Sequence, residues 1–140
     1  MHHFCTYFDS RYLPRGLVLY ESLKRHGGEF DLLVLCLDEA TYDVLHRLAL
    51  PEIRLLQLAE LEGRDRELHA CKAARSPIEY YFTATSCLAL YALERLREGE
   101  VITYLDSDLA FFSSIEPLFD ELGRNSIAIF EHRYSPAIRA

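Results

Sequence analysis

The feature that most constrains the fold is an uninterrupted apolar run, "LLVLCL", at residues 32–37. A strand with one face in water alternates polar and apolar side chains, so an unbroken run is typical of a strand that is covered on both faces. Asp38 follows directly and can cap a helix, because the apolar positions of the next segment have helical spacing. The run therefore predicts a strand of a parallel sheet that leads into a helix.

The rest of the chain alternates strand-like with helix-like segments. Helix signals include Pro14 in a first turn, Gly27 after a last turn, and a capping box at residues 76–79. This alternation predicts the α/β class, with a mainly parallel, twisted, Rossmann-like sheet that has helices on both faces. The predicted strands are at residues 4–7, 32–37, 53–57, 101–105 and 126–130, and the predicted helices are at 14–26, after Asp38, at 77–98 with a break near 83–86, and at 117–122.

Length and charge limit the partners of the chain. Its 140 residues suit one domain. The net charge of −7 argues against nucleic acid as a partner, because phosphate backbones require a basic surface. No apolar run approaches the roughly 20 residues that span a bilayer, and the first residues lack a secretory signal pattern. An anionic ligand would need a local cluster of cations or a metal to offset the overall charge.

The cysteines have no metal-ligand spacing. Cys5 and Cys36 lie in apolar, strand-like runs, where cysteine is usually a small buried side chain. We interpret these two, with Cys71 and Cys87, as reduced thiols and expect a cytoplasmic protein.

Two aspartates, Asp106 and Asp108, follow the predicted strand 101–105, with only Ser107 between them. The apolar stretch "LAFF" comes next, so we expect the carboxylates to be pinned between buried segments. Two close negative charges are costly unless a proton or a cation lies between them. Carboxylate oxygens suit Mg²⁺ or Mn²⁺, which keep open positions for water and phosphates. The alternative, that both are loop carboxylates that cap turns, stays open.

A second polar group follows the first predicted strand, at Thr6, Tyr7 and Asp9. In open α/β sheets, ligands bind at the carboxyl ends of the strands. If the first strand and strand 101–105 are neighbours, one crevice holds these side chains and the paired aspartates.

The segments "YLDSDLAFF" and "TYFDSRYLPRGLVLYESL" together resemble the GT-A glycosyltransferases, especially the glycogenin-like nucleotide-diphospho-sugar transferases. The resemblance covers residues 4–136. In that family the first strand and its loop hold the nucleotide, and a DxD motif after a later strand holds Mn²⁺ or Mg²⁺ and the diphosphate. The resemblance implies a GT-A type fold and a metal-dependent transferase that takes a nucleotide-sugar donor, with a leaning to UDP-sugar.

The resemblance also implies roles for individual residues. Thr6, Tyr7 and Asp9 would contact the base and ribose. Asp106 would reach the ribose or a metal-bound water, and Asp108 would be the direct metal ligand. Ser107, between the two aspartates, would offer a backbone contact to the nucleotide.

The segment "CKAARSPIEYYFT" resembles the family stretch in which a basic residue approaches the sugar diphosphate. Lys72 or Arg75 would fill that role, and Arg75 is favoured for its planar fork of donors. A solvated helix face is the alternative for both. Tyr80 and Tyr81 are predicted to be core residues.

Domains of this family continue past the point where the chain stops. We therefore expect residues 1–140 to be a single nucleotide-sugar-binding domain that lacks most of the acceptor-binding half. Such a chain is expected not to transfer sugar alone, and to self-associate through apolar surface around Phe111, Phe112 and Ile129. No catalytic residue is assigned.

Two other functions stay open. A phosphatase of the haloacid dehalogenase type also has a DxD after an apolar strand, but it places the motif on the first strand and follows it with Gly-Thr. Here Leu109 and Ala110 follow it, late in the chain. The other alternative is a non-catalytic nucleotide-binding or interaction domain, which metal-dependent nucleotide binding would separate from the transferase.

Overall fold

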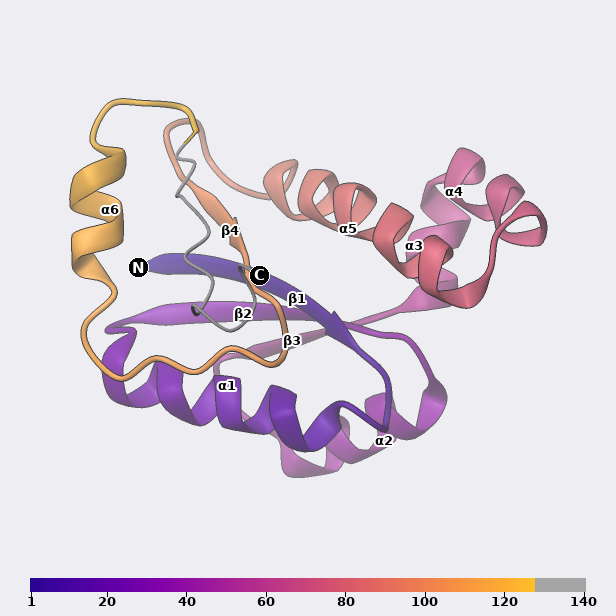
Figure 1. Ribbon diagram of the computed structural model, residues 1–140, viewed down its shortest axis with the longest axis horizontal. Helices are drawn as coiled ribbons and strands as arrows, with labels where there is room; N and C mark the ends of the chain where they lie inside the picture. Colours follow the sequence, from indigo (N-terminus) through magenta and orange to yellow (C-terminus); the bar gives the residue numbers. More distant parts are fainter. Residues whose placement is uncertain (128–140) are drawn as a thin grey trace, which may run out of the picture.

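The computed structural model describes residues 1–127, which form one parallel sheet with helices packed on both of its faces (Figure 1). The strand order is β3-β2-β1-β4. Central strand β1 pairs with β2 along its whole length and with β4 over three residues, His3 opposite Ile102 through Cys5 opposite Tyr104. The predicted α/β class is confirmed. The strands are β1 (His2–Phe8), β2 (Phe30–Cys36), β3 (Ile53–Gln57) and β4 (Ile102–Tyr104).

Two apolar cores lie on opposite faces of the sheet, because successive side chains of a strand point to opposite sides. Phe4 and Phe8 of β1 lie in one core, together with Leu19 and Leu23 of the helix that follows β1. Cys5 of β1 faces the other core. The first face is covered by α1 (Leu13–His26), α2 (Glu39–Leu48) and α6 (Glu116–Leu122), and the second by α3 (Leu58–Arg64), α4 (Arg66–Cys71) and α5 (Pro77–Leu93).

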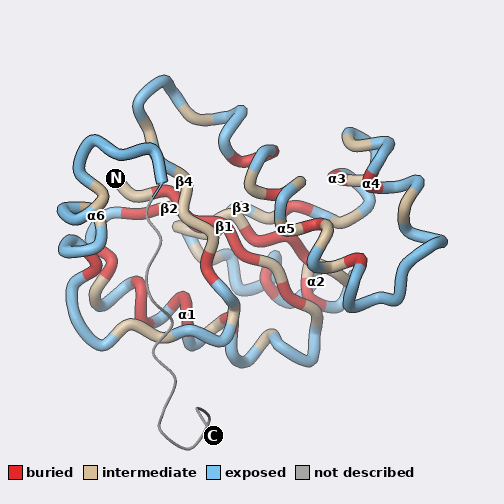
Figure 2. Tube along the Cα trace, turned by 45° about the horizontal axis from the view of Figure 1, so that its top comes forward, coloured by how far each residue is buried: buried red, intermediate tan, exposed pale blue. Residues whose placement is uncertain are grey.

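The buried segments are concentrated in the strands and on the inward sides of α1 and α5, whereas the connecting loops are exposed (Figure 2). Helix α6 lies beside the start of β1. His2 stacks on Phe119 at 4.2 Å between ring centroids, and its Nε2 lies 2.9 Å from Oε1 of Glu116. These contacts attach the segment that follows β4 to the central strand.

The predicted helix starts agree with the structure to within one residue. The Asp38 side chain accepts a hydrogen bond from the backbone N–H of Thr41 at 2.8 Å and begins α2. Ser76 and Glu79 form the predicted capping box at the start of α5. Each cap satisfies backbone donors that have no partner within their helix.

The predicted break in α5 is wrong, because the helix runs without interruption, and the predicted end is wrong as well, because the helix ends at Leu93 and not at residue 98. The hydroxyls of Thr83 and Thr85 donate to the backbone carbonyls of Glu79 and Tyr81, one turn earlier, at 2.8 and 3.3 Å. A hydroxyl that bonds back in this way leaves the helical hydrogen bonds in place. Polar residues that suggest a break in the sequence are therefore accommodated inside the helix.

The segment after α5 differs from its prediction in two places. Strand β4 contains only Ile102–Tyr104, although the backbone N–H of Leu105 still donates to the carbonyl of Cys5 at 2.9 Å. The last predicted strand begins at Ser126, but Ser126 and Ile127 are not in a strand, and residues 128–130 lie outside the described residues.

Candidate functional site

The carboxyl ends of β1 and β4 meet at a cavity of about 590 Å³. Because the two strands are hydrogen-bonded neighbours, the residues that follow them line the same space. A cavity of this size falls within the range of small-molecule sites. Its lining comes from β1 and its loop (Tyr7, Phe8, Asp9, Arg11, Tyr12), from the end of β4 and its loop (Tyr104, Asp106, Ser107, Asp108), from α5 (Ile78, Tyr81, Phe82) and from Leu37.

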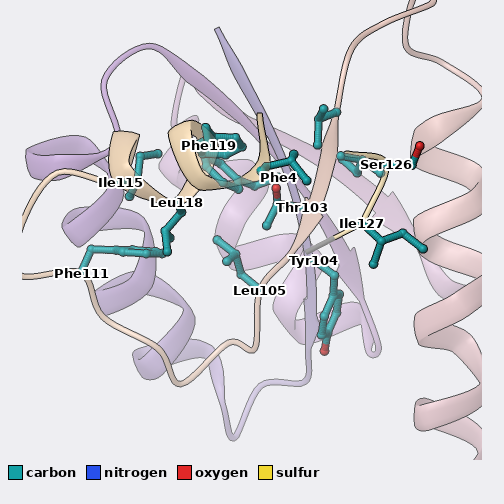
Figure 3. Close-up of a pocket in the computed structure, with 13 residues that line it drawn as sticks. Phe4, Thr103, Tyr104, Leu105, Phe111, Ile115, Leu118, Phe119, Ser126 and Ile127 are labelled. Carbon is teal, nitrogen blue, oxygen red and sulfur yellow. The ribbon is translucent and has the colours of Figure 1, made fainter. Parts of the chain in front are cut away.

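A second cavity, of about 350 Å³, lies on the other side of β4, against α6. Figure 3 shows Phe119 on this helix close to Phe4 of β1, with Leu105 nearby. Its lining includes no charged side chain among the described residues, so it has little to attract a phosphate or a metal. The cavity between β1 and β4 is therefore the stronger candidate for a polar ligand.

Asp106 and Asp108 both lie on the cavity wall and are exposed. The expectation that they are pinned between buried segments is correct only on one side. Leu105 is buried, but Leu109 is 44% exposed and Phe112 is 89% exposed. The chain leaves the sheet after Leu105 and turns over the surface, where the N–H of Leu109 bonds to the carbonyl of Asp106 at 3.1 Å. Water therefore screens the two carboxylates, and their repulsion alone does not require a cation.

Within residues 1–127 there is no group of three or more His, Cys, Asp or Glu side chains arranged to hold a metal. The pair Asp106 and Asp108 still fits a hard divalent cation that shares its coordination with a ligand. Mg²⁺ is commonly bound by one or two carboxylates, with water and substrate phosphates as the other ligands. The donor set here suits that shared arrangement better than a closed, all-protein site.

Asp9 organises the loop between β1 and α1. Its Oδ1 accepts hydrogen bonds from the backbone N–H groups of Arg11 and Tyr12, each at 3.1 Å. Its Oδ2 accepts from the Arg11 side chain, at 2.9 Å from Nε and 2.7 Å from Nη2. Much of the acceptor capacity of Asp9 is thus used inside the protein. A ligand that contacts this loop meets a fixed backbone.

Tyr7 and Tyr104 lie side by side at the base of the cavity, with ring centroids 5.9 Å apart. Burial, together with the neighbouring Tyr7 and Asp106, raises the pKa of Tyr104. Its phenol therefore stays protonated at neutral pH, and it can donate a hydrogen bond. The pair offers a flat, mostly apolar surface beside the carboxylates.

Thr6 does not line the cavity. It is fully buried, and its hydroxyl has no hydrogen-bond partner among the described residues. Thr6 lies inside β1 on the face of the sheet opposite Tyr7, the face of Phe4 and Phe8. Phe8 lines the cavity because it is the last residue of the strand, whereas Thr6 is covered by its neighbours. A side-chain contact from Thr6 to a nucleotide is not supported by this placement.

Lys72 and Arg75 also lie away from the lining. The Nζ of Lys72 pairs with Oε1 of Glu62 at 2.6 Å, and Arg75 donates to the hydroxyl of Thr83. Lys72 borders a different cavity, of about 230 Å³, at the ends of β2 and β3. Neither side chain is placed to contact a ligand between β1 and β4.

The sequence analysis did not predict that Arg11 and residues of α5 line the cavity. Tyr80 is buried as predicted, but the next residue, Tyr81, is half-buried and lines the cavity. Neighbouring residues of a helix point about 100° apart, so one of two adjacent tyrosines can reach the core while the other reaches the site. Arg11 stands in the loop directly after the first strand, and that position was the signal for it.

The names of two curated relatives of the chain give no function. No model of a known protein family matches the chain. Uncharacterized protein YfnD of Bacillus subtilis (strain 168) is 30% identical over 134 residues, which cover 96% of this chain and 42% of that protein. Uncharacterized protein YfnF of the same organism is 30% identical over 117 residues, with shares of 84% and 38%. The chain thus spans less than half the length of these two relatives.

Two solved structures have a similar fold. One is the galactosyltransferase LgtC in complex with donor and acceptor sugar analogs, with a TM-score of 0.54 and 22% identity over 84% of this chain and 42% of that one. The other is mouse xyloside xylosyltransferase 1 in its apo form, with a TM-score of 0.55 and 20% identity over 86% of this chain and 47% of that one.

Among the described residues, no helix is both long and apolar enough to cross a membrane. The parallel sheet, its helices and the two structural matches agree with each other. Over the part that it shares with them, the chain has the same fold as these two structures, the GT-A fold.

Proposed function

We propose that the chain binds a nucleoside-diphosphate sugar in the cavity between β1 and β4, as the donor-binding part of a glycosyltransferase that depends on Mn²⁺ or Mg²⁺. One observation carries the proposal. The pairing of β1 with β4 brings Tyr7, the Asp9 loop and the segment Asp106–Asp108 into one cavity. That placement combines a flat aromatic surface with two carboxylates at the carboxyl ends of parallel strands.

Charge supports a role for a metal. The chain has a net charge of −7, and three carboxylates line the cavity, from Asp9, Asp106 and Asp108. A diphosphate is itself anionic, so these groups repel it unless a cation lies between them. Asp108 and Asp106 would hold a divalent cation, and when bound it would supply Lewis-acid stabilisation of charge on the departing diphosphate.

The other residues bind and orient the donor. Tyr7 and Tyr104 would pack against the base or ribose, and the protonated Tyr104 hydroxyl would donate to an oxygen of the ligand. The Asp9 loop would present a fixed backbone to the nucleotide. In the transfer reaction, the bond from the sugar's anomeric carbon to the diphosphate oxygen breaks, and its electron pair leaves with the nucleoside diphosphate. A bond to an acceptor hydroxyl oxygen forms, and the proton of that hydroxyl passes to the released diphosphate or to water.

Calorimetric titration with UDP tests the donor site. We expect binding with Mn²⁺ and a loss of at least about tenfold in affinity with chelator, since charge-assisted contacts of this kind are strong. Asp108→Asn should cause a similar loss. Asp43→Asn, which removes the same charge from an exposed position on α2, is the matched control and should bind as the parent does. Equal UDP affinity with Mn²⁺ and with chelator would contradict the metal-dependent site.

The alternatives lead to different results. An affinity for UDP that is the same with and without metal would favour a non-catalytic nucleotide-binding domain. The haloacid dehalogenase alternative is disfavoured because the two aspartates follow β4, and the fold is GT-A. Transfer to an acceptor stays a proposal for the whole protein. We expect this chain alone to release UDP slowly from a UDP-sugar, with no gain from added acceptor, because positioning of both reactants supplies much of the rate.

Self-association stays a prediction. Phe112 is exposed and Phe111 is half-buried against the core, while Ile129 lies outside the described residues. Light scattering on the purified chain measures the oligomeric state. A monomer at all concentrations would contradict the prediction.

A further inference from the structure

The candidate donor site contains one cationic side chain within the described part of the chain, and it is Arg11. The sequence assigned a diphosphate contact to Lys72 or Arg75, but neither lines the cavity. Three carboxylates and one guanidinium surround a space that the proposed function fills with a diphosphate. Arg11 therefore carries a positive charge in a lining that also holds the negative charges of Asp9, Asp106 and Asp108.

Arg11 has donors to spare. Its Nε and Nη2 donate to Oδ2 of Asp9, whereas no protein partner within residues 1–127 accepts from Nη1. A guanidinium carries five N–H donors in a planar fork, so three of them remain for water or a ligand. The side chain is 83% exposed, which leaves it free to change rotamer.

Asp9 does not depend on the guanidinium for its position. Its other oxygen is held by the backbone N–H groups of Arg11 and Tyr12. If the Arg11 side chain rotates toward a ligand, the loop keeps these two hydrogen bonds. Exposed ion pairs contribute little to stability, so exchange of the Asp9 carboxylate for a phosphate costs little.

We propose that Arg11 contacts the diphosphate of the bound ligand through its planar fork, and so favours nucleoside diphosphates over monophosphates and nucleosides. This inference rests on the proposed function. The phosphates are the anionic part of such a ligand, and arginine matches their oxygens bidentately in a way that lysine does not. In the structure the same fork pairs with Asp9, which partly neutralises the charge of the guanidinium.

The test compares three ligands, UDP, UMP and uridine, each with Mn²⁺, by calorimetric titration. Arg11→Ala should weaken UDP binding about tenfold, weaken UMP binding less, and leave uridine binding unchanged. Arg11→Lys should recover only part of the loss. Arg47→Ala is the matched control, because Arg47 is exposed on α2 and does not line the cavity, and it should bind all three ligands as the parent does.

The outcomes separate this inference from the proposed function. If Arg11→Ala binds UDP as the parent does while Asp108→Asn loses it, Arg11 has no diphosphate contact and the donor site stands. If Arg11→Ala loses affinity for uridine as much as for UDP, the residue supports the loop and not the phosphates, which also overturns the inference. If the affinity for UDP is the same with Mn²⁺ and with chelator, the proposal of a metal-dependent site is wrong. A loss of affinity in Arg11→Ala that affects UDP but not uridine would still support the contact between Arg11 and the diphosphate. Thermal melts check that each variant is folded.

Discussion

Two glycines in helices, Gly16 of α1 and Gly63 of α3, give a matched test of the packing that supports the site. Alanine is the better helix former by about 1 kcal/mol in a helix interior, so propensity alone predicts that both Gly→Ala variants are stabilised. The structure predicts opposite signs. An added Cβ at Gly63 meets nothing within 4 Å, whereas at Gly16 it meets the ring of Phe8.

The clash at Gly16 sets the magnitude. The new Cβ would lie 2.5 Å from Cζ and 2.9 Å from Cδ1 of Phe8, and closer still to Cε1. Ordinary carbon contacts are at about 3.5–4.0 Å, so the ring or the helix must move by about 1 Å. Phe8 is 3% exposed and packed in the core, which leaves it little room. Overpacking of this kind costs about 1–3 kcal/mol, and three close ring atoms favour the upper end.

The expected net effect of Gly16→Ala is therefore a loss of about 1–2 kcal/mol in the free energy of unfolding, after the helix gain is subtracted. Gly63→Ala should gain up to about 1 kcal/mol. Urea denaturation at an unchanged m-value measures both. Because Phe8 also lines the site, Gly16→Ala should weaken UDP binding as well. A Gly16→Ala protein that is as stabilised as Gly63→Ala would refute the close contact between α1 and the end of β1.

Three further predictions concern stability. Burial would raise the pKa of Asp38, but hydrogen bonds from Thr41 and Ser10 outweigh it and lower the pKa to about 2. Its contribution of about 1–2 kcal/mol is therefore present above about pH 4 and is lost as the pH falls toward 2, so Asp38→Asn should flatten the stability profile measured in that window by chemical denaturation. Leu88→Ala should destabilise by about 2–5 kcal/mol because Leu88 is fully buried, whereas Leu90→Ala on the exposed side of α5 should change the urea midpoint little. Ser76→Ala should cost about 1 kcal/mol through loss of the capping box, and an unchanged melting temperature would mean that the cap is redundant.

The sequence predicted the fold well where local signals coincide with tertiary packing. The apolar run after Phe30 became β2, Asp38 and Ser76 begin helices, and Ile53–Gln57 is a strand with the predicted bounds. In each case a cap or a turn residue marks the same boundary that burial requires. The break in α5 was predicted from polar residues, and it failed because their hydroxyls bond within the helix.

The site was predictable in part. The prediction of a shared crevice required the first and fourth strands to be neighbours. The pairing of β1 with β4 satisfies that condition. The placement of Lys72 and Arg75 was not predictable, because it depends on how residues 58–75 fold, and this segment has no clear periodicity. It forms two short helices and a turn that direct Lys72 to Glu62 and Arg75 to Thr83. The predicted contact from Thr6 depends on the face of β1 that its side chain takes, and Thr6 is fully buried on the face opposite Tyr7.

The two partners of β1 also differ in how far along the chain they lie. His2 pairs with Phe30 across a single crossover, whereas His3 pairs with Ile102, and this contact closes a loop of nearly all the intervening elements. A contact between such distant positions carries a larger loop-closure entropy, and the β4 ladder contains only three residue pairs. Within residues 1–127, β4 has a ladder partner only on its β1 side. Strand β4 is therefore the part of the sheet that we expect to form last in folding and to open first by local unfolding. Opening of this one strand would carry Asp106 and Asp108 away while Tyr7 and Asp9 stay in place, so the proposed donor site would be lost well before the fold is.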